Sequence, residues 1–346
     1  MCELLGMNFN EPISPTFTFR GFTKRGDFNP DGWGIALYPN GGLAVQIIKE
    51  PVNAYTSRLA NYIINTSGNF TSKIYISHVR QKSRGESVYR NTHPFSRELN
   101  GRDYCFAHNG TLTGSYKYDL LLGMFNPIGE TDSEYVFCHI MEFVKNRIIN
   151  RSWDQSSFSL LYEKFREINA YGKFNCLFSD GEHLFCYHDK CGYNGLHYVR
   201  RVAPFTKVKL ADEDFEIDLK EEKKPEQAGY IVATRPLTNE NWIGFARGQF
   251  VVFKDGKIIY NKYPIGETEL RILKAIRTTP HKVSIEYLSS FMNLPYSTVV
   301  EYIKNLRDNG YIKQDSTDMV DPLDKNANYY TVKERRDEID SIIKNF

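Results

Sequence analysis

The chain begins Met1-Cys2-Glu3-Leu4-Leu5-Gly6, which places a thiol directly in front of an apolar run. Residues 2–8 are typical of a short strand that enters a hydrophobic core. On position alone, Cys2 is an inert cysteine at a chain terminus. If the methionine is removed, however, Cys2 carries a thiol together with a free α-amine. That amine has a reference pKa of about 8, so one residue would supply both a nucleophile and a base near neutral pH.

The composition is that of a soluble globular protein, with 41% hydrophobic and 25% charged residues. The 346 residues suffice for one large domain and a smaller one. No apolar stretch approaches the roughly 20 residues of a membrane span, and no basic segment precedes an apolar one at the N-terminus. The six cysteines are scattered, which favours free thiols over a disulfide framework. We therefore expect a cytoplasmic protein without a membrane partner.

Alternating and amphipathic patterns predict an α+β fold in residues 2–262. Asn109-Gly110 is expected to form a turn after a strand over residues 104–108. A helix is expected to begin near residue 131, capped by Thr131 or Asp132, with Glu134 at the capping-box position. Strands are further predicted over 33–38, 43–49 and 73–79 and in five later segments (FNCLFSD, HLFCYH, LHYVRRV, YIVAT and QFVVFKDGKIIY), and helices over 56–65 and 156–171.

The composition changes near Lys262-Tyr263-Pro264-Ile265-Gly266. Residues 263–346 then show a helix, a second helix that Ser284 can cap, a third helix that ends at Gly310, and two strand-like segments. A helix, a helix-turn-helix and a hairpin in this order are typical of a winged helix. We therefore expect a second, winged-helix-like domain over residues 263–346.

Four short segments of the first domain carry side chains suited to chemistry. Arg80, with Ser83 nearby, ends a strand and offers a planar fork to a carboxylate. The Asn109 amide and the Gly110 N–H can together stabilise an oxyanion. Asp132 at a helix start can bind an ammonium group or cap the helix. His93, in the segment Asn91-Thr92-His93-Pro94-Phe95, is better interpreted as part of a structural turn.

Taken in order, these segments resemble the class II, or N-terminal nucleophile, glutamine amidotransferases, in particular the small stand-alone type called YafJ-like. The resemblance covers about residues 2–260 and includes the late segment from Ala233 to Trp242. The ordered set is specific, although each motif is weak alone. It comprises Met1-Cys2, Arg25-Gly26 with Asp31-Gly32-Trp33-Gly34, His78-x-Arg80-x-x-Ser83-x-Gly85, Asn91-x-His93-Pro94, Ala107-His108-Asn109-Gly110 and Glu130-Thr131-Asp132-Ser133-Glu134.

The resemblance implies a four-layer αββα sandwich and a role for each matched residue. Cys2 would be the nucleophile, with its own amine as general base. Arg80 with Ser83 would hold the α-carboxylate of glutamine, and Asp132 its α-ammonium. The Asn109 side chain and the Gly110 N–H would form the oxyanion hole, whereas the loop from Arg25 to Gly34 would be structural. No cofactor and no metal is implied.

Two positions depart from the better-known amidotransferases. Gln81 stands where those enzymes usually have an aromatic residue, and Arg84 replaces a histidine. These departures leave two substrates open, glutamine itself or another γ-glutamyl amide or peptide.

Other patterns are interpreted without a special function. His183, Cys186, His188 and Cys191 do not have the spacing of a zinc site. The charged run over residues 212–224 is expected to be a solvated loop, and the glycine-rich stretch over residues 25–34 lacks the spacing of a phosphate loop.

Charge disfavours DNA as the partner of the second domain. Residues 264–346 carry 12 Lys and Arg against 13 Asp and Glu, a net charge of −1. The expected recognition helix sets Lys304 and Arg307 against Glu301 and Asp308, and phosphate neutralisation needs a basic excess. We expect protein interaction instead, with an ammonia-accepting enzyme or in a homodimer. A ligand-sensing regulator that acts through this domain is the alternative from another functional class. The expected wing is acidic: Asp315, Asp318, Asp321 and Asp324 stand against Lys313 and Lys325.

Overall fold

The computed structural model divides the chain into two compact units, Met1–Lys262 and Tyr263–Phe346, which are described separately. The structure describes residues 1–66, 68–83, 85–148, 153–280, 283–308, 310–314, 328–333 and 336–344.

The first unit contains a seven-stranded sheet with the N-terminal strand in its interior. β1 (Glu3–Ile13) pairs antiparallel with β4 (Ser72–Val79) on one side and with β12 (Gly229–Ala233) on the other. Pairing on both sides fixes the register of β1 and therefore the position of the residue in front of it. The outer strands are β2 (Trp33–Leu37), β3 (Gln46–Glu50), β9 (His197–Arg201) and β13 (Ile243–Gly244).

A six-stranded sheet lies against the first one. Its order is β15-β14-β8-β7-β6-β5, and β6 (Arg102–Leu112) pairs with β7 (Gly172–Ser179) along its whole length. The remaining strands are β5 (Phe95–Leu99), β8 (His183–Tyr187), β14 (Phe250–Lys254) and β15 (Lys257–Lys262).

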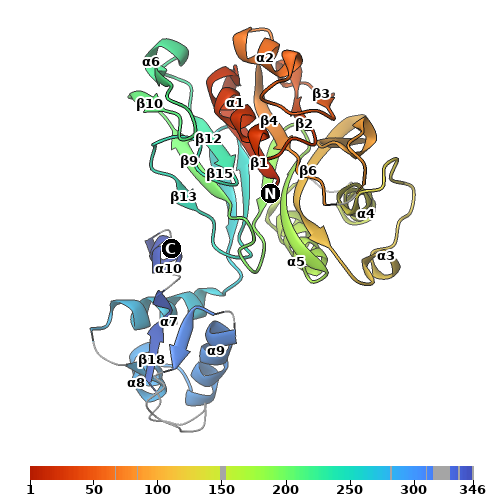
Figure 1. Ribbon diagram of the computed structural model, residues 1–346. Coiled ribbons are helices and arrows are strands. Elements are labelled where there is room, and N and C mark those ends of the chain that lie inside the picture. The colour runs from red at the N-terminus through yellow and green to blue at the C-terminus, as the bar shows by residue number, and fades with distance from the viewer. Residues whose placement is uncertain are drawn as a thin grey trace. The chain divides into compact units, whose positions relative to one another are not determined.

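Hydrophobic clusters arrange these sheets in four layers (Figure 1). Leu4 and Ile76 of one sheet meet Ala107 and Leu177 of the other in a shared core. The outer face of the seven-stranded sheet packs against α1 (Thr16–Thr23) and α2 (Arg58–Asn65). The outer face of the six-stranded sheet packs against α4 (Asp132–Arg147) and α5 (Gln155–Asn169). The predicted αββα sandwich is confirmed.

The prediction of a turn at Asn109-Gly110 is wrong, because both residues lie inside β6. Asn109 faces Asn175 across the ladder, and Gly110 faces Phe174. A Cβ at Gly110 would lie only 1.9 Å from the Lys173 carbonyl oxygen, so glycine serves here for close strand approach rather than for a turn.

The charged run over residues 212–224 is more ordered than the expected solvated loop. It contains β11 (Glu216–Asp218), which pairs with β10 (Lys207–Lys209), and α6 (Leu219–Glu222). Asp212, the first residue of this run, forms an ion pair with the buried Arg25, so its carboxylate is not simply solvated. Short elements elsewhere are η1 (Lys24–Asp27), η2 (Pro39–Gly41), η3 (Tyr89–Asn91) and α3 (Tyr116–Asp119).

The second unit combines helices with a three-stranded sheet. Ser284 caps α8 by accepting a hydrogen bond from the Tyr287 N–H at 3.1 Å, as predicted, and Gly310 follows α9 with a positive φ of 71°. The winged-helix assignment stays a prediction, and the wing residues Asp315, Asp318, Asp321, Asp324 and Lys325 lie outside the described residues. The elements are α7 (Glu267–Thr278), β16 (Val283–Ser284), α8 (Ile285–Met292), α9 (Tyr296–Asp308), β17 (Ile312–Gln314), β18 (Asn328–Thr331) and α10 (Arg336–Lys344), with sheet order β16-β18-β17.

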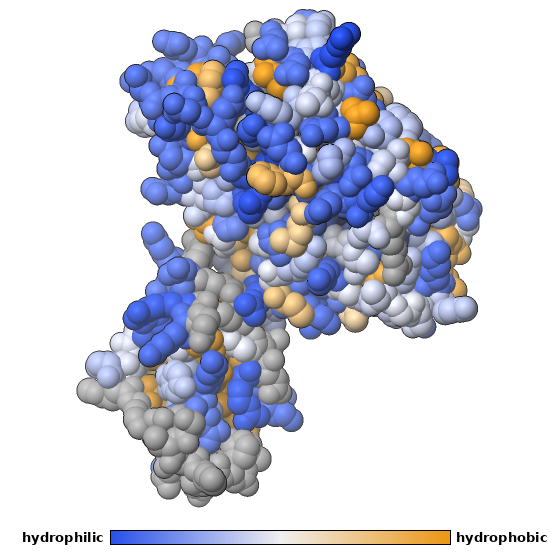
Figure 2. Space-filling view, in the orientation of Figure 1, coloured by the Kyte–Doolittle hydropathy of each residue, from blue (hydrophilic) through white to orange (hydrophobic). Residues whose placement is uncertain are grey.

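Among the described residues, no helix combines the length and the apolar character that a membrane crossing requires. On the face of the first unit that Figure 2 shows, hydrophobic residues form small patches among hydrophilic ones.

Candidate active site

A buried ion network holds the first residue of β1, next to Cys2. The Glu3 carboxylate accepts from Arg25 Nη1 at 3.0 Å and from Arg235 Nε at 2.8 Å. Arg25 also donates to Asp212 at 2.7 Å and to the Pro236 carbonyl at 2.6 Å. Glu3 and Arg25 are 2% and 3% exposed, so water does not solvate their charges, and the ion pair compensates for the lost solvation. The network ties the N-terminal end of the chain to two distant loops.

The Cys2 thiol is partly buried and lies against the backbone of Gln81. Its Sγ donates to the Gln81 carbonyl oxygen at 3.1 Å and accepts from the Gln81 N–H at 3.2 Å. Burial raises the pKa of Cys2, because the thiolate would lose solvation. The Met1 amine donates to Gln81 Oε1, so Gln81 contacts both the Met1 amine and the Cys2 thiol. A thiol with a raised pKa needs a base before it can attack.

Two asparagine amides converge on the Cys2 carbonyl oxygen. Asn109 Nδ2 donates to it at 2.6 Å from β6, and Asn194 Nδ2 donates at 2.8 Å from the loop after β8. Asn109 was predicted to act at this site, whereas Asn194 was not. Its sequence signal is a glycine-flanked asparagine, Asn194-Gly195, which marks any turn.

A second network orients the loop that carries Asn194. The buried Asp189 accepts hydrogen bonds from the N–H groups of Cys191 and Tyr193 at 2.8 and 3.1 Å. Asn175, the cross-strand neighbour of Asn109, donates to the Tyr193 carbonyl at 2.6 Å. Asn194 itself adopts a left-handed backbone with φ of 57°, a conformation that asparagine tolerates. The loop is therefore fixed by the same sheet that carries Asn109.

Arg80 follows β4 directly and is 3% exposed. Its guanidinium donates to the carbonyl oxygens of Glu86 at 3.0 Å and of Gly85 at 3.4 Å. Asp31 fixes the same loop by accepting from the Lys82 N–H at 2.9 Å. Burial lowers the pKa of Arg80, although the Cys2 and Asp31 charges oppose this shift. An arginine remains a cation at physiological pH even so.

Ser83 and Asp132 are both tied to β6. The Ser83 hydroxyl lies 3.4 Å from the Thr111 hydroxyl, and Asp132 Oδ2 accepts from the Leu112 N–H at 2.6 Å. Of the two proposed caps of α4, Thr131 fills the position, accepting from the Glu134 N–H at 3.2 Å. Asp132 is the first residue of the helix, where its carboxylate benefits from the helix dipole. Arg84 lies outside the described residues.

The structure thus brings most predicted residues to one place. Cys2 contacts Asn109 and the residue after Arg80, and β6 carries Gly110 together with the anchors of Ser83 and Asp132.

Three buried histidines are close in sequence to predicted site residues. The rings of His78 and His93 stack with centroids 4.2 Å apart, and burial lowers the pKa of His78 to about 3. His108, next to Asn109, lies 2.9 Å from the Ser133 hydroxyl and 3.1 Å from the Lys173 carbonyl oxygen. Burial also lowers the pKa of His93 and of His108, so these rings are neutral and structural.

The described residues include no cluster of three metal ligands. Cys186 lies in the core between the sheets, whereas His183 bonds to Asp180.

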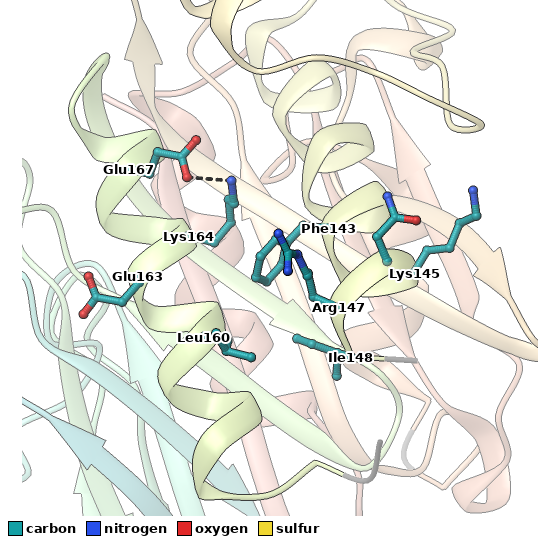
Figure 3. A pocket seen from close by; sticks show the side chains of 9 residues that line it. Phe143, Lys145, Arg147, Ile148, Leu160, Glu163, Lys164 and Glu167 are labelled. Carbon is teal, nitrogen blue, oxygen red and sulfur yellow. Dashed lines mark hydrogen bonds and ion pairs between the residues drawn. The ribbon is translucent and has the colours of Figure 1, made fainter. Parts of the chain in front are cut away.

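Two hollows differ in what lines them. One of about 730 Å³ lies between α4 and α5, lined by Phe143, Lys164 and Glu167 among others, and holds none of the predicted site residues (Figure 3). A second, of about 240 Å³, is lined by the two residues that flank Cys2 in the chain; we call it the Met1 hollow. Its lining residues are Met1, Glu3, Phe28, Asn29, Asn194 and Arg235.

Comparison with known proteins identifies the family of this chain. The sequence profile of the class II glutamine amidotransferases matches residues 1–272. An uncharacterized protein of Methanocaldococcus jannaschii, MJ1515, is 44% identical over all of this chain and 97% of its own length. The putative glutamine amidotransferase YafJ of Escherichia coli is 38% identical over 73% of this chain and 97% of its own length.

Solved structures show the same fold. A predicted glutamine amidotransferase from Pseudomonas aeruginosa matches with a TM-score of 0.55 and 32% identity, over 75% of this chain and all of the other. Glutamine phosphoribosylpyrophosphate amidotransferase of B. subtilis shares the fold alone, with a TM-score of 0.51 and 16% identity over 75% of this chain and 49% of its own. The match over residues 1–272, together with the E. coli relative, shows that this chain belongs to the class II glutamine amidotransferase family.

Proposed function

We propose that the first unit hydrolyses the side-chain amide of glutamine, or of a related γ-glutamyl compound, through a thioester on Cys2. The observation that carries the proposal is the convergence on Cys2: Gln81 on its thiol, and Asn109 on its carbonyl at 2.6 Å. Removal of Met1 would free the Cys2 α-amine, the base that a buried thiol of raised pKa requires.

Substrate recognition is assigned to Arg80, Ser83 and Asp132. The guanidinium of Arg80, oriented by two carbonyl oxygens, would bind the α-carboxylate of the substrate with help from Ser83. Asp132 would bind the α-ammonium from the start of α4. Binding of both the α-carboxylate and the α-ammonium of the substrate would place its γ-amide against the Cys2 thiol, which lowers the entropic part of the activation barrier.

Each chemical step then has a group to serve it. The α-amine takes the thiol proton, and sulfur attacks the amide carbon. The oxyanion that forms is stabilised by Asn109 Nδ2 and the Gly110 N–H. The C–N bond breaks as the α-ammonium returns its proton to the leaving nitrogen. Water then attacks the thioester, with the same amine as base, and releases glutamate and the free thiol.

Three measurements test this proposal on the full chain. Mass spectrometry should find Cys2 as the first residue, and a fully active protein that retains Met1 would overturn the assignment of the base. Cys2→Ala should release no glutamate from glutamine. Asn109→Ala should reduce kcat by about 10²–10³, the usual loss for one oxyanion donor; wild-type rates in either variant would refute the corresponding role.

A further inference from the structure

We infer that the Met1 hollow is the leaving-group subsite, and that it takes γ-glutamyl amides whose amine carries a carboxylate, namely γ-glutamyl amino acids or peptides. The inference rests on the proposed function and names its substrate class. The hollow shares Asn194 and Glu3 with the surroundings of Cys2 but none of the residues assigned to the glutamate moiety.

The proposed proton transfer to the leaving amine places that amine next to the Cys2 α-nitrogen. The group that protonates the departing nitrogen is the Cys2 α-ammonium, so that nitrogen must lie within hydrogen-bonding reach of it. Met1 is bonded to the same α-nitrogen and lines the hollow. The space that Met1 vacates is therefore continuous with the place where the amine departs.

The volume of the Met1 hollow exceeds the volume that a departing ammonia molecule requires. The hollow measures about 240 Å³ with Met1 still in place. A molecule of the size of water or ammonia occupies about 30 Å³ in the liquid. The hollow can thus hold a substituent of several heavy atoms on the leaving nitrogen.

The lining residues indicate the chemistry of that substituent. Two contacts tie Arg235 to Glu3, yet the side chain is 51% exposed, so its guanidinium can also meet a carboxylate. The Phe28 ring is 76% exposed and offers apolar contact. Asn29 is buried and donates from Nδ2 to the Arg25 carbonyl oxygen at 2.9 Å, so it forms part of the wall of the hollow. A cation and a ring together fit an amino acid better than ammonia.

The chemical balance is that of the proposed hydrolysis with a larger amine. The Cys2 sulfur bonds to the γ-carbon, the C–N bond breaks, and the amino acid leaves with the proton of the α-ammonium. Water then cleaves the C–S bond and yields glutamate, so no oxidant or further reactant is needed.

The test compares kcat/KM for γ-glutamylalanine, γ-glutamylethylamide and glutamine, using the full chain with Cys2 verified as first residue. We expect γ-glutamylalanine to exceed the ethylamide at least tenfold, because only the former carries a carboxylate on the amine. Arg235→Met should lower that ratio roughly tenfold, as expected for a lost charge-assisted hydrogen bond. Arg235→Lys should restore part of it. A ratio taken within one preparation cancels any change in the folded fraction.

The experiment includes a matched control variant, and two different negative results distinguish failure of this inference from failure of the proposed function. Phe28→Ala should weaken γ-glutamylalanine turnover more than that of the ethylamide, whereas Tyr62→Ala, at an exposed aromatic residue on α2, should leave the ratio unchanged. Hydrolysis of glutamine without preference for γ-glutamylalanine would overturn the inference and leave the proposed function standing. Absence of glutamate release from all three substrates would overturn the proposed function itself.

Discussion

Replacing Glu3 by glutamine tests whether the buried charge network holds Cys2, the proposed nucleophile, in place. Glu3→Gln keeps the shape but removes the charge that faces Arg25 at 3.0 Å and Arg235 at 2.7 Å. Breaking a buried ion pair from one side costs about 3–5 kcal/mol. Arg25 keeps Asp212 as a second carboxylate at 2.7 Å, so we expect the lower end, about 3 kcal/mol.

This cost converts to a measurable shift in thermal unfolding. An unfolding entropy of about 2.1 cal/mol/K per residue over a unit of this length gives a Tm lower by about 5 °C. Glutaminase activity at a temperature well below Tm should fall as well, because the residue next to Cys2 is released from the network. Circular dichroism follows the first quantity and glutamate release the second.

The control is a surface pair of the same type. Glu213→Gln breaks the ion pair with Arg20, whose side chains are 24% and 36% exposed, and exposed pairs contribute at most about 1 kcal/mol. We expect its Tm to fall by less than 2 °C. A Glu3→Gln protein with the Tm and activity of the Glu213→Gln protein would refute the reasoning.

Four further outcomes follow from the site. Asn194→Gly keeps the left-handed backbone but loses the donor to the Cys2 carbonyl, so kcat for glutamine should fall about tenfold with little change in KM. Gly110→Ala sets a Cβ 1.9 Å from a backbone oxygen of β7, and the protein should lose activity and unfold at lower urea concentration. Because burial raises the pKa of Cys2, iodoacetamide should alkylate this thiol slowly at pH 7 in protein that retains Met1, and the rate should still rise above pH 9. Burial lowers the pKa of His78 to about 3 and also lowers those of His93 and His108, so below pH 6 the unfolded chain binds protons at these residues that the folded chain does not; urea titrations should show stability rising with pH, and His78→Phe should reduce that slope by up to about 1.4 kcal/mol per pH unit.

The sequence allowed the layers to be predicted because periodicity reports which face of an element is buried. Strands such as 73–79 and amphipathic helices such as 156–171 carry their own pattern, and both elements form as expected. Asn109-Gly110 misled the prediction, because a turn dipeptide and a close strand crossing call for the same residues. Only the neighbouring β7, distant in sequence, distinguishes the two.

The residues of the candidate site likewise fall into those that a sequence pattern reveals and those that only the fold reveals. Cys2, Arg80, Asn109 and Asp132 occur in ordered motifs, so a resemblance could locate them. Asn194 depends on Asp189 and Asn175 for its position, and neither contact has a sequence signature. Residues whose role is to hold other residues become visible only when the fold brings them together.

The same dependence on distant residues shows how the backbone at Cys2, the proposed nucleophile, is held in place next to the N-terminal residue. Termini fray unless their backbone is tied down, and a frayed thiol could not meet an oxyanion hole. Here β1 pairs on both sides, Glu3 is held by two arginines, and the Cys2 carbonyl is held by two asparagines. Every one of these restraints acts at or after the Cys2 carbonyl, whereas Met1, which is bonded to the Cys2 α-nitrogen, lines the Met1 hollow. The backbone is therefore held immediately after Cys2, and removal of residue 1 would free the α-nitrogen that the proposed mechanism needs for proton exchange with substrate and water.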